Sequence, residues 1–77
     1  LNKINMKFIG ALSKKYPGLT KTELKICSMM KSGLDTEHIT KLLSVSVRTL
    51  QNHRHHIIKK LNLSKGKSLV YFINRLN

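Results

Sequence analysis

Residues 34–60 read LDTEHITKLLSVSVRTLQNHRHHIIKK, and this stretch decides the fold. Apolar residues recur at helical spacing in two segments, residues 35–43 and residues 46–62, the second of which runs slightly past the quoted stretch. Only residues 43–46 connect the two segments. Because a connection this short makes two helices cross steeply, the stretch predicts a helix-turn-helix motif.

Three helix starts in this chain share one local pattern. In that pattern an apolar residue precedes a polar N-cap and packs on an apolar residue four positions into the helix. The three N-caps are Thr20, Asp35 and Ser46. Thr20 is followed three residues later by Glu23, which predicts a capping box. The helix that begins there is expected over residues 20–32, with Gly33 as the residue that ends it.

Two further helices flank this central region. At the N-terminal side, residues 4–15 carry apolar residues at a spacing of four and end before Pro17, which disfavours continued helix. The apolar positions are Ile4, Phe8, Leu12 and Tyr16. At the C-terminal side a helix is expected over about residues 65–76, although no N-cap pattern marks its start. Its core positions are Leu69, Phe72, Ile73 and Leu76.

The predicted fold class is therefore all-α, with four helices in a helix-turn-helix domain and one additional N-terminal helix. The chain shows no alternating strand pattern and no internal repeat. We expect residues 19–77 to form the helix-turn-helix domain and residues 1–18 to form a helix or linker to an upstream region. The chain begins with Leu1 rather than Met, and we expect it to be one domain of a longer protein.

The excess of basic residues in the composition indicates which class of molecule the chain binds. Fifteen Lys and Arg residues face three acids, and the formal net charge is +12 over 77 residues. Such a charge repels itself in a compact domain, so it indicates an anionic partner, either nucleic acid or a membrane surface. The single cysteine, Cys27, excludes an internal disulfide and fits a reducing compartment. No apolar run approaches the roughly 20 residues of a membrane span.

The helix over residues 46–62 has two distinct faces. Its core stripe consists of Leu50, Ile57 and Leu61, with Val47 and Ile58 at the flank. The opposite face collects Arg48, Gln51, Asn52, His55, Lys59 and Asn62. Arg, Gln and Asn side chains carry the paired donors and acceptors that read base edges in the DNA major groove. An ordinary solvated helix would mix Glu with Lys, so the lack of acid favours DNA contact over a merely solvated face.

Arg54 falls inside the apolar stripe of this helix, where a charge needs a partner. Glu23 falls in the middle of the apolar arc of the helix over residues 20–32. One interpretation is a buried Glu23–Arg54 pair. The alternative is that Glu23 only caps its own helix, while Arg54 extends its charged end to the rim of the core. The residues alone leave both interpretations open.

The histidines do not predict a metal site, and no cofactor is expected. His53 and His56 share one side of their helix, whereas His55 points elsewhere. Zinc sites need three or four ligands, usually with Cys or carboxylate, and Cys27 occupies a core position of a different helix. With three acids, no glycine-rich phosphate loop and an apolar setting for the thiol, no enzymatic activity is expected.

Residues 19–63 resemble the LuxR/GerE-type helix-turn-helix domain of bacterial transcriptional regulators. The matching elements are Leu19-Thr20 with Glu23, Gly33-Leu34, His38-Ile39-Thr40, residues 43–46, Thr49-Leu50 and Lys60-Leu61. The resemblance implies a four-helix fold whose third helix, about residues 46–62, enters the major groove of double-stranded DNA. The implied base-reading residues are Gln51, Asn52 and His55, with Arg48 beside them.

The same resemblance implies the remaining contacts. Phosphate contacts fall near Ser46, Thr49 and Lys60, and Lys59 is close enough to join them. The last helix is where many members dimerise, and its outward residues are Val70, Tyr71 and Asn74. Thr40 stands where Ala is usual in the family, which implies looser packing between the two motif helices. Gln51, Asn52 and His55 replace a more basic set found in many members, so the operator is expected to differ.

Phe8 and Tyr16-Pro17 resemble a subgroup in which this domain ends a longer regulator, after a sensor region with tetratricopeptide repeats and a coiled coil. A cytoplasmic location at the nucleoid is implied, with a membrane tether for the full-length protein in some members. A sigma-factor helix-turn-helix is the nearest alternative fold. A basic module that binds an anionic membrane or an acidic protein is the alternative function. A single-stranded RNA binder would need exposed aromatic residues, of which the chain has few.

Overall fold

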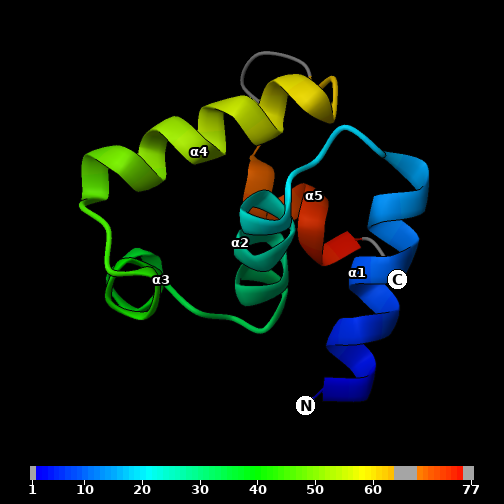
Figure 1. Cartoon of the computed structure of the whole chain (residues 1–77), viewed down its shortest axis with the longest axis horizontal. Helices are drawn as coiled ribbons and strands as arrows, with labels where there is room; N and C mark the ends of the chain where they lie inside the picture. The colour runs from blue at the N-terminus through cyan, green and yellow to red at the C-terminus, as the bar shows by residue number, and fades with distance from the viewer. Residues whose placement is uncertain (1, 64–67, 76–77) are drawn as a thin grey trace.

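The computed structural model describes residues 2–63 and 68–75, with side chains from residue 6 onward. Within these ranges the chain forms helices and no strands (Figure 1). The helices are α1 (Asn2–Lys15), α2 (Lys21–Lys31), α3 (Thr36–Leu43), α4 (Val47–Lys60) and α5 (Leu69–Arg75). The prediction of an all-α fold with a helix-turn-helix and an extra N-terminal helix is confirmed.

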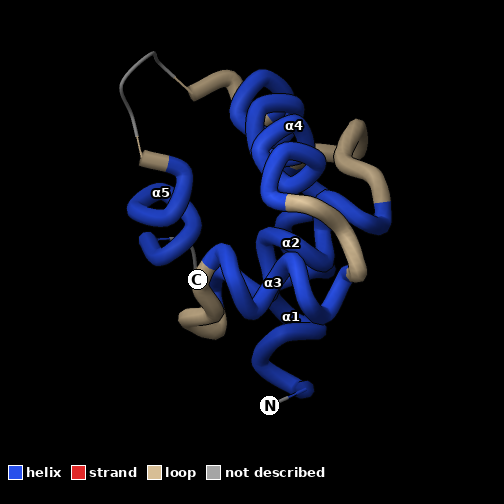
Figure 2. The backbone as a smooth tube through the Cα atoms, turned by 90° about the vertical axis from the view of Figure 1, so that its left-hand side faces the viewer, coloured by secondary structure: helices blue, strands red, loops and turns tan. Residues whose placement is uncertain are grey.

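Helix α2 lies at the centre of the molecule and contacts α1, α4 and α5 (Figure 1). Helix α3 contacts α4, with which it forms the motif. Figure 2 shows α4 above α2 and α3, with α5 to one side. The core therefore lies between α2 and the helices around it. Its buried members are Phe8, Leu12, Leu19, Ile26, Cys27, Met30, Ile39, Leu50, Ile57, Leu61, Leu69 and Ile73.

The three predicted N-caps are all confirmed. Thr20 forms the capping box, in which the Glu23 N–H donates to Thr20 Oγ1 at 3.1 Å and the Thr20 N–H donates to Glu23 Oε1 at 2.8 Å. Asp35 Oδ1 accepts from the His38 N–H at 3.0 Å. Ser46 Oγ accepts from the Thr49 N–H at 3.1 Å. These bonds satisfy N–H groups that no helical carbonyl can reach, which is why the helices begin at these residues.

Three helices end in a residue with left-handed backbone conformation. These residues are Gly33, Ser44 and Asn62, with φ angles of 89°, 56° and 58°. After each of them, the next N–H donates back to a carbonyl in the last turn of the helix, as when the Val45 N–H donates to the Thr40 carbonyl at 3.1 Å. This Schellman arrangement stops each helix and turns the chain sharply.

The left-handed conformation of Asn62 also corrects a boundary. The pattern predicted a helix to residue 62, but α4 ends at Lys60, with Leu61 as its cap. The fourth predicted helix, α5, is described from Leu69, and Ser68 Oγ accepts from the Tyr71 N–H at 3.2 Å. Its predicted start near residue 65 and its predicted core residue Leu76 lie outside the described residues, as does the side chain of Ile4.

Candidate nucleic-acid interface

The polar face of α4 is exposed along its whole length. Each of the residues predicted to read bases is exposed, and so is Lys59; the set is Arg48, Gln51, Asn52, His55 and Lys59. The opposite face is buried through Leu50 and Ile57. Helix α4 runs along one edge of the molecule in Figure 1, so its polar face is not covered by another described helix.

The flanks of α4 differ from the simple helical-wheel picture. Val47, predicted to flank the core, is 52% exposed because it is the first residue of the helix. Ile58 is half-buried. An open hollow beside this flank is lined by Gln51, Asn52, Arg54, His55 and Ile58. Three of the base-reading candidates, Gln51, Asn52 and His55, are therefore brought together, with Arg54 next to them, whereas Arg48 does not line this hollow.

The N-terminus of α4 presents two hydroxyl groups. Ser46 Oγ caps the helix and also donates to Thr49 Oγ1 at 3.1 Å. Ser46 is exposed and Thr49 is half-buried. The first N–H groups of a helix point outward and favour anions, so both predicted phosphate contacts lie where a phosphate is electrostatically favoured.

Lys60, the last residue of α4, is held by an acid from α2. Its Nζ donates to Glu23 Oε1 at 2.7 Å, and Glu23 is buried while the Lys60 side chain is 36% exposed. The predicted Glu23–Arg54 pair is therefore wrong. The alternative was correct in giving Glu23 a capping role, but the carboxylate also binds Lys60.

The reason for this error lies in the packing of α2 against α4. A helical wheel gives the direction of each side chain around its own axis, but it does not give the rotation and height of one helix against another. The end of α4 lies against the start of α2, so Lys60 rather than Arg54 reaches Glu23.

The pKa of Glu23 depends on its burial and on its hydrogen bonds with Lys60 and Thr20. Burial by itself raises the pKa of the carboxyl group, but hydrogen bonds from the Lys60 side chain and the Thr20 backbone outweigh that effect. The pKa therefore lies below its ordinary value, and the carboxylate stays charged at neutral pH.

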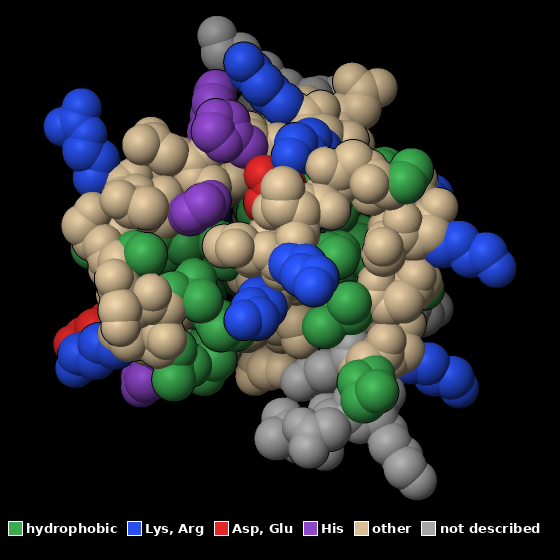
Figure 3. Space-filling model, viewed as in Figure 1, with side chains coloured by type: hydrophobic (Ala, Val, Ile, Leu, Met, Phe, Trp, Pro, Cys, Tyr) green, Lys and Arg blue, Asp and Glu red, His purple; other side chains and the backbone are tan. Residues whose placement is uncertain are grey.

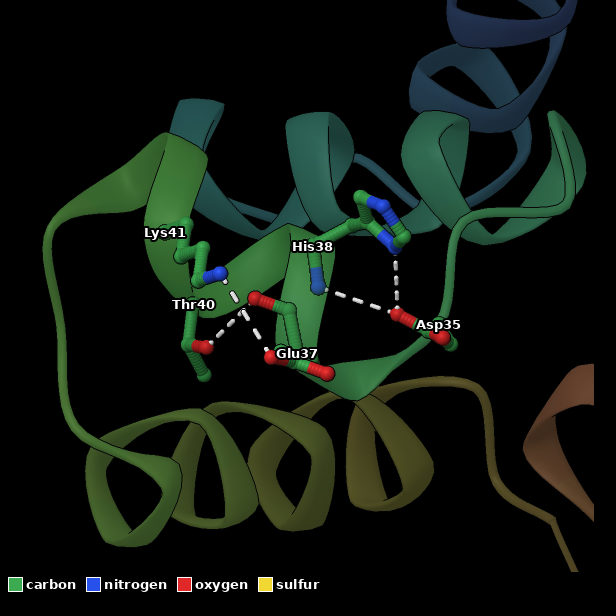
Figure 4. A network of polar contacts seen from close by, with 5 residues as sticks. All are labelled: Asp35, Glu37, His38, Thr40 and Lys41. Atoms are coloured by element: carbon green, nitrogen blue, oxygen red, sulfur yellow. Dashed lines mark hydrogen bonds and ion pairs between the residues drawn. The ribbon is translucent and has the colours of Figure 1, made fainter.

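The other two acids lie at the start of α3, Asp35 as its N-cap and Glu37 in its first turn, and they form a polar network of their own (Figure 4). Asp35 Oδ1 lies 2.7 Å from His38 Nδ1, and Lys41 Nζ lies 3.4 Å from Glu37 Oε2. Thr40, where Ala is usual in the resembled family, is buried and donates its hydroxyl to the Glu37 carbonyl at 2.8 Å. Its polar atom is thus satisfied within α3, so the contact with α4 accommodates the hydroxyl.

The histidines of α4 spread around the helix. His53 is half-buried, whereas His55 and His56 are exposed, and Figure 3 shows histidine side chains gathered over α4. In the part of the chain that the structure describes, no three metal-ligating side chains come together. Cys27 is fully buried, and burial together with the charge of Glu23 raises the pKa of its thiol to about 12. The thiol therefore stays protonated, as expected of a core residue.

The predicted dimer face of α5 is exposed. Val70 and Tyr71 are 39% and 59% exposed, and Asn74 is exposed as well. The Tyr71 hydroxyl accepts a hydrogen bond from Arg75 Nη1 at 2.9 Å, and the Asn74 carbonyl accepts one from Lys31 Nζ at 3.3 Å. These bonds hold the aromatic ring and the end of α5 in place on the surface.

Comparison with known proteins identifies the family. The family model described as bacterial regulatory proteins, luxR family, matches residues 17–73, which is more than half of the chain. Oxygen regulatory protein NreC of Staphylococcus carnosus is 39% identical over 54 residues, which cover 70% of the chain and 25% of that protein. Transcriptional regulatory protein TdiR of Thauera aromatica is 35% identical over 57 residues, covering 74% of the chain and 25% of that protein.

A third relative extends the match along the chain. NreC of Staphylococcus epidermidis is 34% identical over 64 residues, covering 83% of the chain and 29% of that protein. The chain thus spans less than a third of the length of these relatives. No solved structure was found to match. In the described ranges, no helix is both long enough and apolar enough to cross a membrane.

The family match confirms the resemblance on which the helix-turn-helix assignment rested. The matched residues begin at the turn before α2 and end within α5, so they contain the whole helix-turn-helix and the exposed face of α4. The family is not enzymatic. The chain belongs to the luxR family of bacterial regulatory proteins and is the DNA-binding domain of a transcriptional regulator.

Proposed function

We propose that the chain binds double-stranded DNA in a sequence-specific manner, with α4 in the major groove. One observation carries the proposal: the exposed face of α4 holds Arg, Gln, Asn, His and Lys but no acid. A major groove about 12 Å wide admits an α-helix, and the side chains on such a face match the donors and acceptors of base edges.

Four residues are proposed to read bases. Arg48 and the amides of Gln51 and Asn52 can each form paired hydrogen bonds, Arg with guanine and the amides with adenine. His55 lies one turn after Gln51 on the same face. All four are exposed, and Gln51, Asn52 and His55 line one hollow, which supports this role.

Backbone contacts are proposed at both ends of α4. Ser46 and Thr49 would bind a phosphate at the N-terminus of the helix, where N–H groups support the anion. Lys59 is exposed at the other end and would reach the phosphate backbone. Lys60 would contribute less of its charge, because Glu23 already neutralises part of it.

The setting of the domain is also a proposal. We infer that residues 1–18 connect it to an upstream sensor region of a longer regulator, because the relatives are three to four times as long as their matched segments. A homodimer through Val70, Tyr71 and Asn74 would place two α4 helices on one operator. The site of action would be the nucleoid, in the cytoplasm, whether or not the full-length protein is tethered to a membrane.

Selection from a pool of random duplex oligonucleotides with the purified chain tests this function. We expect one enriched motif, and a palindromic motif would support the dimer. We also expect affinity to fall steeply with salt, because lysines and arginines displace counterions from DNA. Recovery of no motif, together with binding to vesicles of anionic phospholipid, would instead support a basic module for membrane surfaces.

A further inference from the structure

Arg54 occupies a position on α4 that neither the core nor the base-reading face explains. It lies four residues after Leu50 and three before Ile57, both of which are fully buried, yet Arg54 is half-buried. Its side chain lines two separate concavities. One is a cavity of about 350 Å³ between α2, α3, α4 and α5, and the other is the open hollow beside Gln51, Asn52 and His55.

The cavity is a poor environment for a guanidinium group. It is lined mainly by apolar side chains, among them Ile26, Met30, Ile39 and Leu50; the acid Asp35 also lines it but is paired with His38 and forms no ion pair with Arg54 in the described residues. An unpaired charge in such surroundings is strongly unfavourable, because it loses hydration without gaining a partner. The charged end of Arg54 is therefore more stable in the open hollow, with its methylene stem over the apolar rim.

No acid in the described chain neutralises Arg54. Glu23 is bound by Lys60 at 2.7 Å, Asp35 by His38 at 2.7 Å and Glu37 by Lys41 at 3.4 Å. Arg54 itself makes no ion pair and no hydrogen bond within residues 2–63 and 68–75. All three acids of the sequence thus have other partners, which leaves the Arg54 guanidinium available to the anion of another molecule.

We propose that Arg54 binds a DNA phosphate on one wall of the major groove. The inference rests on the proposed function, because it requires α4 to lie in that groove. At about 100° per residue, Arg54 lies about 60° from Gln51, on the side away from Asn52. Lys60, whose charge Glu23 partly neutralises, lies on the other flank of the base-reading face, so the two cations border that face on opposite sides.

The two flanks of the base-reading face would then face the two sugar-phosphate backbones that border the major groove. A planar guanidinium on a long stem suits this place, because it can bind a phosphate with two parallel hydrogen bonds. Arg54 would thus fix the rotation of α4 about its own axis, and with it the bases that Gln51 and Asn52 reach.

The test compares two substitutions that each remove one positive charge and keep an unbranched apolar side chain. Arg54→Met alters the proposed phosphate contact, and Lys7→Met alters an exposed residue of α1 that has no proposed DNA role. Binding to a mixed-sequence DNA duplex is measured over a range of salt concentrations. We expect Arg54→Met to lower the slope of log affinity against log salt by about 0.9, the value for one phosphate contact.

Lys7→Met should leave that slope nearly unchanged, and Arg54→Lys should restore most of it. The melting temperature of Arg54→Met should be unchanged or higher, because methionine suits the apolar rim. A lower melting temperature with an unchanged salt slope would overturn the inference, since Arg54 would then serve only the fold.

Asn52→Ala separates this failure from failure of the proposed function. If Asn52→Ala changes sequence preference while Arg54→Met behaves like Lys7→Met, α4 reads DNA but Arg54 does not bind a phosphate. If neither Asn52→Ala nor Arg54→Met changes DNA binding, α4 does not enter the groove and both proposals fail.

Discussion

The exposed faces of α3 and α4 belong to one motif, yet their charges are arranged differently. On α3 (Figure 4) each acid has a basic neighbour one turn away, as in the Glu37–Lys41 pair. On α4 there is no acid in the helix, and Arg48 and Lys59 form no ion pair in the described chain. An exposed helix normally pairs opposite charges along its surface, as α3 does. The difference indicates that the charge of α4 serves an external anion.

The one described acid that reaches α4 is Glu23, and its replacement is expected to have the largest effect. Glu23→Gln removes the charge that holds Lys60 and weakens the cap of α2, so the free energy of unfolding should fall by about 2–3 kcal/mol. Urea denaturation at neutral pH measures this change. A loss below about 0.5 kcal/mol would show that the pair contributes no more than the exposed pair on α3.

The same pair makes stability depend on pH. Because the pKa of Glu23 in the folded chain lies below the ordinary value of 4.5, its contribution is fully present above pH 4.5. As pH falls through the lowered pKa, the carboxylate is protonated and the contribution is lost. Urea midpoints of the parent chain should therefore converge on those of Glu23→Gln in acid, and parallel curves would contradict the assignment.

The next largest effect should come from the base-reading face. Asn52→Ala is expected to relax preference at one base pair of the selected operator, with a loss of about 1–3 kcal/mol against that base. The matched control is Lys41→Ala on α3, which should leave sequence preference unchanged. Competition binding with operators changed at single positions measures both. An equal loss on every sequence would mean that Asn52 touches only the DNA backbone.

A substitution in the turn between α3 and α4 should change the free energy of unfolding by a smaller amount. Ser44 has a φ of 56°, a conformation that costs a residue with a Cβ about 1–2 kcal/mol and costs glycine little. Ser44→Gly should raise the free energy of unfolding by about 0.5–1 kcal/mol, because glycine also loses more chain entropy on folding. Thermal denaturation tests this, with Ser44→Ala as the control that keeps the penalty.

The smallest effect is expected on the surface of α3. Glu37→Gln removes the acid of the Glu37–Lys41 pair, whose side chains are more than 70% exposed. Such a pair contributes about 0.3–0.5 kcal/mol, and salt screens it. The substitution should therefore change stability only slightly and at low salt. A loss as large as that of Glu23→Gln would show that the exposed Glu37–Lys41 pair stabilises the chain as much as the buried Glu23–Lys60 pair does.

Local features of the fold were predictable because short-range interactions decide them. Thr20, Asp35 and Ser46 were identified as N-caps from neighbouring residues alone, and each accepts the expected N–H. Gly33 was identified in the same way as the end of α2. The end of α4 was misplaced by two residues, because Asn62 takes a left-handed conformation that the apolar spacing does not reveal.

The candidate interface was predictable to a similar extent. Helical periodicity alone placed Gln51, Asn52 and His55 on one exposed face, since direction around a single helix depends only on sequence position. The sequence also places Arg54 as a charge in an apolar stripe, but it does not show which residues of other helices surround Arg54. The open hollow that it lines is formed by α4 residues alone, but the cavity on its other side is formed by residues of four helices, so no single stretch of sequence describes that cavity.

Sequence alone thus determined the helices, their caps and the division of α4 into a buried and an exposed face. Those properties follow from backbone hydrogen bonding and from the 3.6-residue turn, which act within a few neighbouring residues. Only the tertiary structure decided that Glu23 binds Lys60 and that Arg54 pairs with no acid in the described residues. The physical reason is that charges from different helices meet only after packing has set the rotation and height of each helix, and this setting depends on the whole core.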